Sequence, residues 1–198
     1  SSFTGLSKSV WALALVLFVN RSGSMVIFFL TLYLTRRLAF PITIAARMMS
    51  VYGLGALAGA YLGGWLSDRI GYSRVQMLSL FFTGIAYFTI ILWENILPIA
   101  INLFILAVIA EAFRPATSTA FAKNAPKKLR SRAFAVQRLA VNLGVAIGPA
   151  VGGVIAKYNY NYLFWIDGIT CIIAAIMHYF FIHNKLKDKP VPGSEIKK

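Results

Sequence analysis

Charged side chains lie deep inside long apolar stretches of this chain. If the stretches are helical, Arg21 lies about 18 Å from the start of the first one. Glu111 and Arg114 share another stretch, and Glu111 lies about 21 Å from the start of it. Both depths reach the middle of a bilayer core. An ionisable group is costly there, so these residues indicate a binding or ion-coupling site.

The types of these residues favour one kind of chemistry. Two arginines against one glutamate leave the site net positive, which suits a solute that carries a carboxylate or phosphate. Glu111 is the acid at mid-depth and is therefore the candidate proton carrier. Asn20 and Asn142 also lie near mid-depth and complete the predicted site. The alternative is a structural ion pair between Arg21 and Glu111 that only locks two helices together.

Six apolar segments must position these groups. The chain is 59% hydrophobic and 13% charged, with a mean hydropathy of +0.71, whereas about a quarter of a soluble domain is charged. Each segment is long enough to cross a hydrocarbon core of about 30 Å as a helix. The segments are Ser9–Leu34, Ile42–Leu66, Val75–Trp93, Leu97–Ala120, Ala133–Ala156 and Asn161–Ile182. The sequence therefore predicts an all-α integral membrane protein, a six-transmembrane-helix bundle.

The net charge of +14 is interpreted as an orientation signal rather than as a nucleic-acid-binding surface. Most of the basic residues that flank the segments fall on one side: Lys8, Arg69, Arg74, Lys123, Lys127, Lys128, Arg130, Arg132, Lys185, Lys187 and Lys189. The other side holds Arg36, Arg37 and Lys157. Because basic loops stay in the cytoplasm, both ends of the chain are predicted to be cytoplasmic, in contact with anionic lipid headgroups.

The connection between the second and third segments carries a motif, Gly64-x-x-x-Asp68-Arg69-x-Gly71, followed by Arg74. Gly71 permits a tight turn that a side chain would strain. Asp68 can accept hydrogen bonds from the free N–H groups at a helix start. Arg69 and Arg74 can bridge to neighbouring helix ends. These properties predict a structured cytoplasmic turn.

The fifth segment carries a second motif, made of Gly144, Gly148, Pro149, Gly152 and Gly153. Glycines four residues apart share one helix face, so another helix can approach that face closely. A proline inside a helix removes one backbone donor and bends the helix. The second segment has a similar glycine stripe, at positions 55, 59 and 63. Both segments are expected to serve as close-packing surfaces.

Together, the two motifs resemble the signatures of the major facilitator superfamily, over residues 5 to 185. The resemblance implies the N-terminal half of a twelve-helix fold, in which the first and fourth helices line a central cavity. It also implies that the 64–74 connection latches the two halves, and that the second and fifth helices face the C-terminal half. The glycine stripes are therefore expected on exposed faces. The fifth-helix motif is closest to that of the proton-coupled drug exporters.

The domain organisation follows from the same comparison. Residues 1–184 are expected to form the six-helix transporter domain. The polar stretch after it, residues 185–198, contains Pro and Gly and is predicted to begin a cytoplasmic linker to the absent C-terminal half.

These features favour a secondary active transporter in the cell's inner (plasma) membrane. It would move a small organic solute by alternating access, coupled to protons, with efflux of drug-like or anionic compounds favoured. Proton-coupled uptake of small organic anions or peptides is one alternative, and a non-transporting six-helix scaffold is another. The expected partners are the solute, protons, the lipid bilayer and the C-terminal half. No catalytic residue, cofactor, metal or nucleic acid is predicted.

Other polar residues in the segments have structural interpretations. Asp167 is expected at the membrane interface or in helix pairing rather than in ligand binding. Cys171 is expected to be a small core residue. His178 and His183 are five residues apart, which is an unfavourable spacing for a metal site on one helix face.

Overall fold

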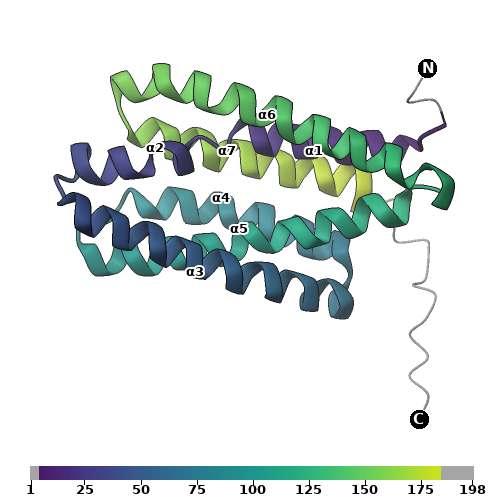
Figure 1. The fold of residues 1–198 in the computed structure, drawn as a ribbon, viewed down its shortest axis with the longest axis horizontal. Coiled ribbons are helices and arrows are strands. Elements are labelled where there is room, and N and C mark those ends of the chain that lie inside the picture. The colour runs from purple at the N-terminus through teal and green to yellow at the C-terminus, as the bar shows by residue number, and fades with distance from the viewer. Residues whose placement is uncertain (1–4, 184–198) are drawn as a thin grey trace, which may run out of the picture.

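The computed structural model describes residues 5–183, which form helices and short connections with no strand among them (Figure 1). The α-helices are α1 (Lys8–Ser22), α2 (Val26–Leu32), α3 (Ile42–Leu66), α4 (Tyr72–Ile90), α5 (Ile96–Asn124), α6 (Arg130–Tyr158) and α7 (Asn161–His178). The shorter turns are η1 (Tyr33–Arg37), η2 (Ser67–Gly71) and η4 (Tyr179–His183), which are π-helical, and η3 (Lys127–Leu129), which is 3-10. The predicted linker, residues 185–198, lies outside the described residues.

Six helical passes run along the bundle, as the sequence predicts. Within residues 5–183, five helical runs are long and apolar enough to cross a membrane, and the run Ile42–Ile90 has 49 residues. That run reverses direction at Ser67–Gly71, so α3 and α4 lie antiparallel between the same two ends (Figure 1). Gly71 makes the reversal with a φ of 89°, a left-handed value that costs glycine little. This run therefore supplies two spans.

The first span is broken, which the sequence analysis did not predict. Its expected helix over residues 9–34 ends at Ser22 and restarts at Val26. Gly23 closes α1, and its N–H donates to the carbonyls of Arg21 and Val19. The hydrogen bonds that would join α1 to α2 are therefore lost at residues 23–25, and other groups must satisfy the N–H groups that open α2.

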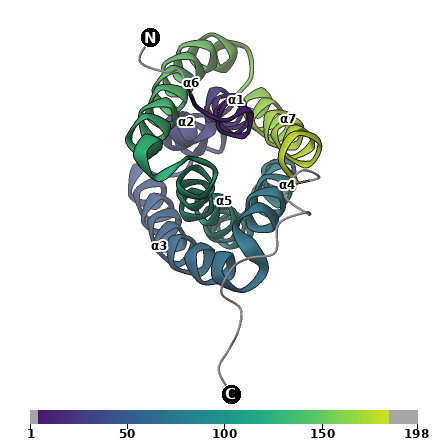
Figure 2. The same ribbon diagram turned by 90° about the vertical axis from the view of Figure 1, so that its right-hand side faces the viewer.

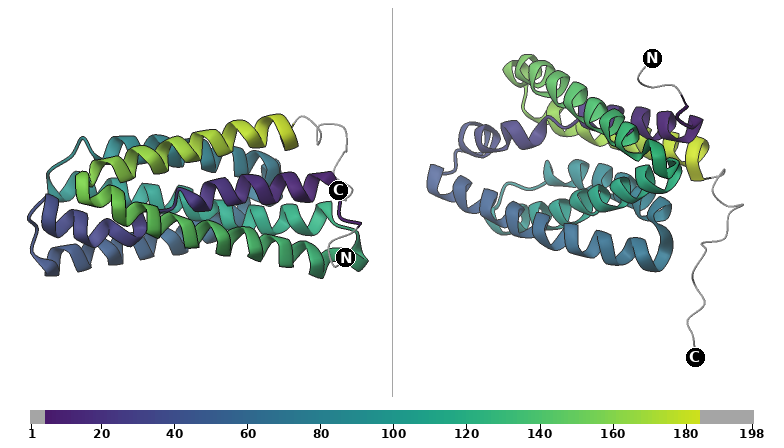
Figure 3. Two further views of the ribbon diagram at one scale, coloured as in Figure 1. Left: turned by 90° about the horizontal axis from the view of Figure 1, so that it is seen from above. Right: turned by 45° about the vertical axis from the view of Figure 1, so that its right-hand side comes forward.

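The helices form two layers (Figure 3). One layer contains α1, α2, α6 and α7, and the other contains α3, α4 and α5. Viewed end-on, α1 and α5 lie in the middle (Figure 2). The buried apolar side chains form two clusters, one that includes Val10 and Phe121 and one that includes Leu34 and Phe164. A polar middle region therefore has an apolar core on each side of it.

The glycines of α3 lie inside the bundle, so the prediction of an exposed glycine face on this helix is wrong. A Cβ built on Gly55 would lie 2.7 Å from the Phe104 carbonyl oxygen, and one on Gly63 would lie 2.5 Å from the Ala112 Cα. α3 therefore packs backbone to backbone against α5. The outward face of α3 carries large apolar side chains instead, including Tyr61, which is 75% exposed.

The glycines of α6 are also buried, so the same correction applies to this helix. A Cβ on Gly144 would lie 2.5 Å from the Arg21 Cβ, and one on Gly152 would lie 2.9 Å from the Phe29 ring. Gly148 lies against the carbonyl oxygens of residues 21, 22 and 24. The glycine spacing does mark a close helix contact, as expected. The partner, however, is the broken first span of the same six-helix unit.

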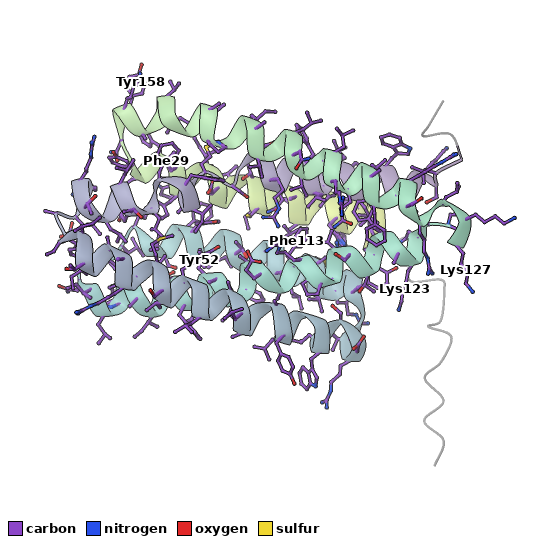
Figure 4. The ribbon with its side chains drawn as sticks, in the orientation of Figure 1. Phe29, Tyr52, Phe113, Lys123, Lys127 and Tyr158 are labelled. Atoms are coloured by element: carbon purple, nitrogen blue, oxygen red, sulfur yellow. The ribbon has the colours of Figure 1, made fainter. Side chains whose placement is uncertain are left out.

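The two ends of the bundle differ in composition. Lys123 and Lys127 mark one end, which we call the basic end, and Tyr158 marks the opposite end (Figure 4). α1 begins and α7 finishes at the basic end (Figure 1). The connections Ser67–Gly71 and Lys127–Leu129 also lie there. This grouping agrees with the division of basic residues that the sequence analysis used.

Candidate functional site

A small polar cavity lies between the two apolar clusters. Its volume is about 40 Å³, and its walls come from α1, α2, α3, α4, α5 and α7. Its polar lining residues include Asn20, Arg21, Tyr52, Thr83, Tyr87 and Glu111. Tyr52 and Phe113 mark its position near the middle of the bundle's length (Figure 4). The structure thus brings Asn20, Arg21 and Glu111, three of the predicted site residues, to one place.

Glu111 pairs with Arg114 rather than with Arg21. The Arg114 Nη1 lies 3.1 Å from the Glu111 Oε2, across one turn of α5. The alternative of a structural ion pair between Arg21 and Glu111 is therefore not what the described residues form. The two residues of the actual pair are three apart on one helix, so they meet without any tertiary constraint. Arg21 still faces the same cavity as Glu111.

Arg114 and Asn142, the other two predicted site residues, do not line this cavity. The Arg114 side chain is 68% exposed, and the Glu111 side chain 17%. Asn142 is exposed on α6, outside the cavity wall. The sequence analysis places Asn142 in the site by depth, and Arg114 by depth and by its position one turn from Glu111 on the same helix face. Depth does not determine the direction in which a side chain leaves its helix.

Sequence reasoning missed the hydroxyl groups that α4 contributes. Ser79, Thr83 and Tyr87 are buried and line the cavity. They are four residues apart, so they share one helix face. A search for polar residues at this period would have found them in an otherwise apolar segment.

Asp167 pairs helices, which is one of the two roles expected of it. Its side chain is fully buried, and its carboxylate accepts hydrogen bonds from the Met25 N–H at 3.0 and 2.9 Å and from the Val26 N–H at 2.8 Å. These donors open α2, and no side chain from α2 itself caps them. Asp167 therefore supplies the cap that the break in the first span requires.

A second buried polar network lies closer to the basic end. The Gln76 Nε2 donates to the Thr117 Oγ1 at 3.0 Å, and the His178 Nε2 lies 3.0 Å from the Gln76 Oε1. All three side chains are buried. The network joins α4, α5 and α7, and none of its three residues lines the cavity.

The 64–74 motif forms the turn expected of it, but two of its side chains act differently. Gly71 has the positive φ, whereas no side chain caps α4, so Asp68 is not a helix cap. The Arg69 guanidinium lies 4.1 Å from the centre of the Trp65 ring instead of bridging to another helix. Arg74 is exposed, and a Cβ built on Gly64 would meet no atom within 4 Å. Within this unit, the polar side chains of the motif remain available at the surface.

The fifth-helix motif lies against the break in the first span. Gly144, Gly148 and Gly152 are buried there, while Gly153 and Pro149 are half-buried. α6 remains helical through Pro149.

A larger groove lies elsewhere and has an apolar lining. It has a volume of about 540 Å³ and lies between α4 and α5 near the end that holds Trp93. Its lining is apolar apart from Thr89 and Asn102, which are hydrogen-bonded to each other at 2.8 Å. A groove without any charged group does not suit a charged solute, so we take the smaller central cavity as the candidate site.

A sequence profile of the Major Facilitator Superfamily matches residues 12–198. The chain belongs to this superfamily. The match covers all six spans, so the helical bundle and its central cavity belong to a known transporter architecture. The chain is thus a multi-pass membrane protein of a transporter family.

Relatives in the superfamily include transporters with named activities. The chain is 31% identical over 161 residues to a multi-drug resistance efflux pump PmrA homolog of Lactococcus lactis, which is 78% of this chain and 39% of that protein. It is 26% identical over 169 residues to a Na(+), Li(+), K(+)/H(+) antiporter of Planococcus maritimus, covering 82% and 39%. It is 22% identical over 140 residues to the quinolone resistance protein NorA of Staphylococcus aureus, covering 71% and 36%. The chain thus spans less than half the length of these relatives.

Proposed function

We propose that this chain is the N-terminal half of a secondary transporter that exports a small organic solute by alternating access, coupled to protons. The observation that carries the proposal is the polar cavity at mid-length, whose walls include both Arg21 and Glu111. An arginine and a carboxylate at this depth are costly unless they act on a solute or an ion. A binding site near the midplane, between two halves, is typical of such transporters.

The solute class follows from the charge at the cavity. Arg21 can bind a carboxylate or phosphate group through paired N–H donors. Glu111 is bonded to a partly exposed arginine of its own helix, so within residues 5–183 Arg21 forms no ion pair. Quinolones carry a carboxylate, and NorA is named for resistance to them. A carboxylate-bearing drug-like compound is therefore the first substrate to test.

Orientation and partners complete the proposal. The basic end is cytoplasmic, since basic connections are retained on that side, and it contacts anionic lipid headgroups. Residues 185–198 begin a linker to the C-terminal half, which would supply the other wall of the cavity. The exposed Asp68 and Arg74 of the 64–74 turn lie at the basic end, where they can meet that half and act as a latch.

The experiment that tests the proposal uses the full-length transporter in inside-out membrane vesicles, with norfloxacin and its methyl ester as substrates. Arg21→Ala should raise the KM for norfloxacin about tenfold, because a charge-assisted hydrogen bond is lost, and should change the KM for the ester far less. Arg47→Ala is the matched control, since Arg47 is exposed and does not line the cavity. Equal effects on the acid and the ester would contradict an anion-binding role.

Proton-coupled uptake of small organic anions or peptides is the alternative, and the same positive cavity supports it. The direction of transport separates the two. Export predicts that norfloxacin accumulates in inside-out vesicles when their lumen is acid, whereas uptake predicts accumulation in right-side-out vesicles when the outside is acid. A non-transporting scaffold would show neither.

A further inference from the structure

The break in the first span is held by one face of α7. Asp167, Thr170 and Cys171 are three and four residues apart, so they lie on the same side of that helix. Asp167 binds the start of α2, and the Cys171 Sγ accepts a hydrogen bond from the Asn20 Nδ2 at 3.4 Å. Between these contacts, Thr170 packs so tightly on Gly23 that a Cβ on Gly23 would overlap the threonine hydroxyl. α7 thus contacts the chain on both sides of the break.

The Asp167 carboxylate and the N–H groups at the start of α2 compensate each other electrostatically. A fully buried carboxylate is unfavourable in hydrocarbon unless hydrogen bonds and opposite charge compensate it. The N–H groups at the start of α2 need acceptors for the same reason, and the Met25 N–H also donates to the Gly23 carbonyl oxygen at 3.0 Å. The Asp167 carboxylate accepts from the Met25 and Val26 N–H groups through three short contacts, and the dipole of α2 adds to this attraction.

The opposite side of the break is closed by α6. A Cβ on Gly144 would lie 2.5 Å from the Arg21 Cβ and 3.0 Å from the Ser22 N. The backbone at Arg21 therefore has α6 on one side and, through Asn20 and Gly23, α7 on the other. These contacts hold the backbone next to Arg21 from two sides.

We propose that Asp167 is a positioning residue for the central cavity: by binding the start of α2 it holds the break and thereby sets the direction of Arg21. The proposal rests on the function proposed above, in which Arg21 binds an anionic group. Asp167 itself does not line the cavity.

The first measurement is transport kinetics of norfloxacin by the full-length transporter in vesicles. Asp167→Asn keeps the shape of the side chain but removes its charge and one acceptor oxygen. It should raise the KM about tenfold and change Vmax less than about twofold. Asp167→Glu, which keeps the carboxylate, should recover part of the affinity. In the double variant with Arg21→Ala, the KM should rise no further than in Arg21→Ala alone, because both changes remove the same interaction.

A second measurement reports the position of residue 21 without any substrate. The thiol of the Arg21→Cys variant is labelled with a small methanethiosulfonate reagent, and mass spectrometry of the peptide gives the rate. Adding Asp167→Asn should change this rate by about tenfold, because the break shifts. Gly23→Ala provides an independent route if Asp167→Asn does not fold, since its methyl group would push α1 away from Thr170.

Gln76→Met is the matched control. Gln76 is as buried as Asp167 and bonds to two side chains, but it lies in the network outside the cavity. This variant should lower the melting temperature and leave both the KM and the labelling rate unchanged. That result would show that a loss of stability alone changes neither the KM for norfloxacin nor the labelling rate at residue 21.

The outcomes separate the two proposals. An unchanged labelling rate at residue 21 in both the Asp167→Asn and Gly23→Ala backgrounds would overturn the positioning role, whatever the transport data show. Additive effects of Asp167→Asn and Arg21→Ala on the KM would overturn it as well. If the labelling rate changes but Arg21→Ala leaves the KM for norfloxacin unaltered, Asp167 positions the break and the anion-binding function fails.

Discussion

Glu111 is the carboxylate on the cavity wall within the described part of the chain, and its ion pair with Arg114 determines what it can do. The Arg114 side chain is mostly exposed at the bundle surface and meets Glu111 across one turn of α5. Under the function proposed above, Glu111 is the group that would carry the proton.

Glu111→Gln tests this role at the scale of one side chain. The variant should lose accumulation of norfloxacin driven by a pH gradient in inside-out vesicles of the full-length transporter. It should keep substrate exchange at equal pH, because the amide cannot carry the proton but does not block the cavity. Glu94→Gln, at an exposed position away from the cavity, should behave as wild type. Continued gradient-driven accumulation by Glu111→Gln would assign coupling to another group.

At the scale of elements, the glycines of α3 and α6 lie in buried contacts within the six-helix unit, whereas the sequence analysis expected them on exposed faces. They let α3 approach α5, and α6 approach the broken first span, at backbone contact distance. Large apolar side chains such as Leu57 and Val154 cover the outer faces of the same two helices. A surface that meets lipid or a second half can therefore be bulky, while the tight contacts lie within the unit.

Two substitutions in α3 should have opposite effects on stability. In Gly59→Ala the new methyl would overlap the Val108 carbonyl oxygen and lie 2.8 Å from the Val108 Cα, and backbone atoms cannot move aside cheaply. We expect a loss of about 1–3 kcal/mol. Gly53→Ala meets no atom within 4 Å and should stabilise the helix by about 0.5–1 kcal/mol. Thermal unfolding of the purified protein in detergent measures both, and a Gly59→Ala protein as stable as wild type would contradict the packing.

At the scale of the whole molecule, the bundle has a polar middle between two apolar clusters and a basic end opposite an end marked by Tyr158. The apolar clusters lie toward the two ends of the unit, and the cavity lies between them. The break in the first span lies at the level of the cavity, since Arg21 precedes the break and lines the cavity wall.

The orientation of the bundle can be tested with two exposed positions at opposite ends. Lys127→Cys and Tyr158→Cys should react with a membrane-impermeant maleimide from opposite sides of the membrane. In intact cells the reagent should label Tyr158→Cys, and in inside-out vesicles it should label Lys127→Cys. Labelling of both from one side would contradict the six-span arrangement. Labelling in the reverse sense would contradict the proposed orientation alone.

The sequence by itself determined the features that depend on composition and local spacing. Six apolar segments, each long enough to cross a bilayer, predicted the six spans because hydrophobic length is a local property. Gly71 predicted the turn after α3 because the left-handed backbone conformation is a property of the residue itself. Glycines four apart predicted close helix contacts because the helix face that they share carries no side chains.

Only the tertiary structure decided which groups meet. Asp167 lies 142 residues from Met25 in the chain, and nothing local to either residue indicates that one caps the other. Periodicity assigned the glycines to one face of each helix, but the rotation of each helix against its neighbours selects the face that is buried. Arg21, Glu111 and Arg114 had plausible depths, yet Arg114 is mostly exposed and does not line the cavity. Depth follows from counting residues, whereas direction follows from packing against helices that are distant in sequence.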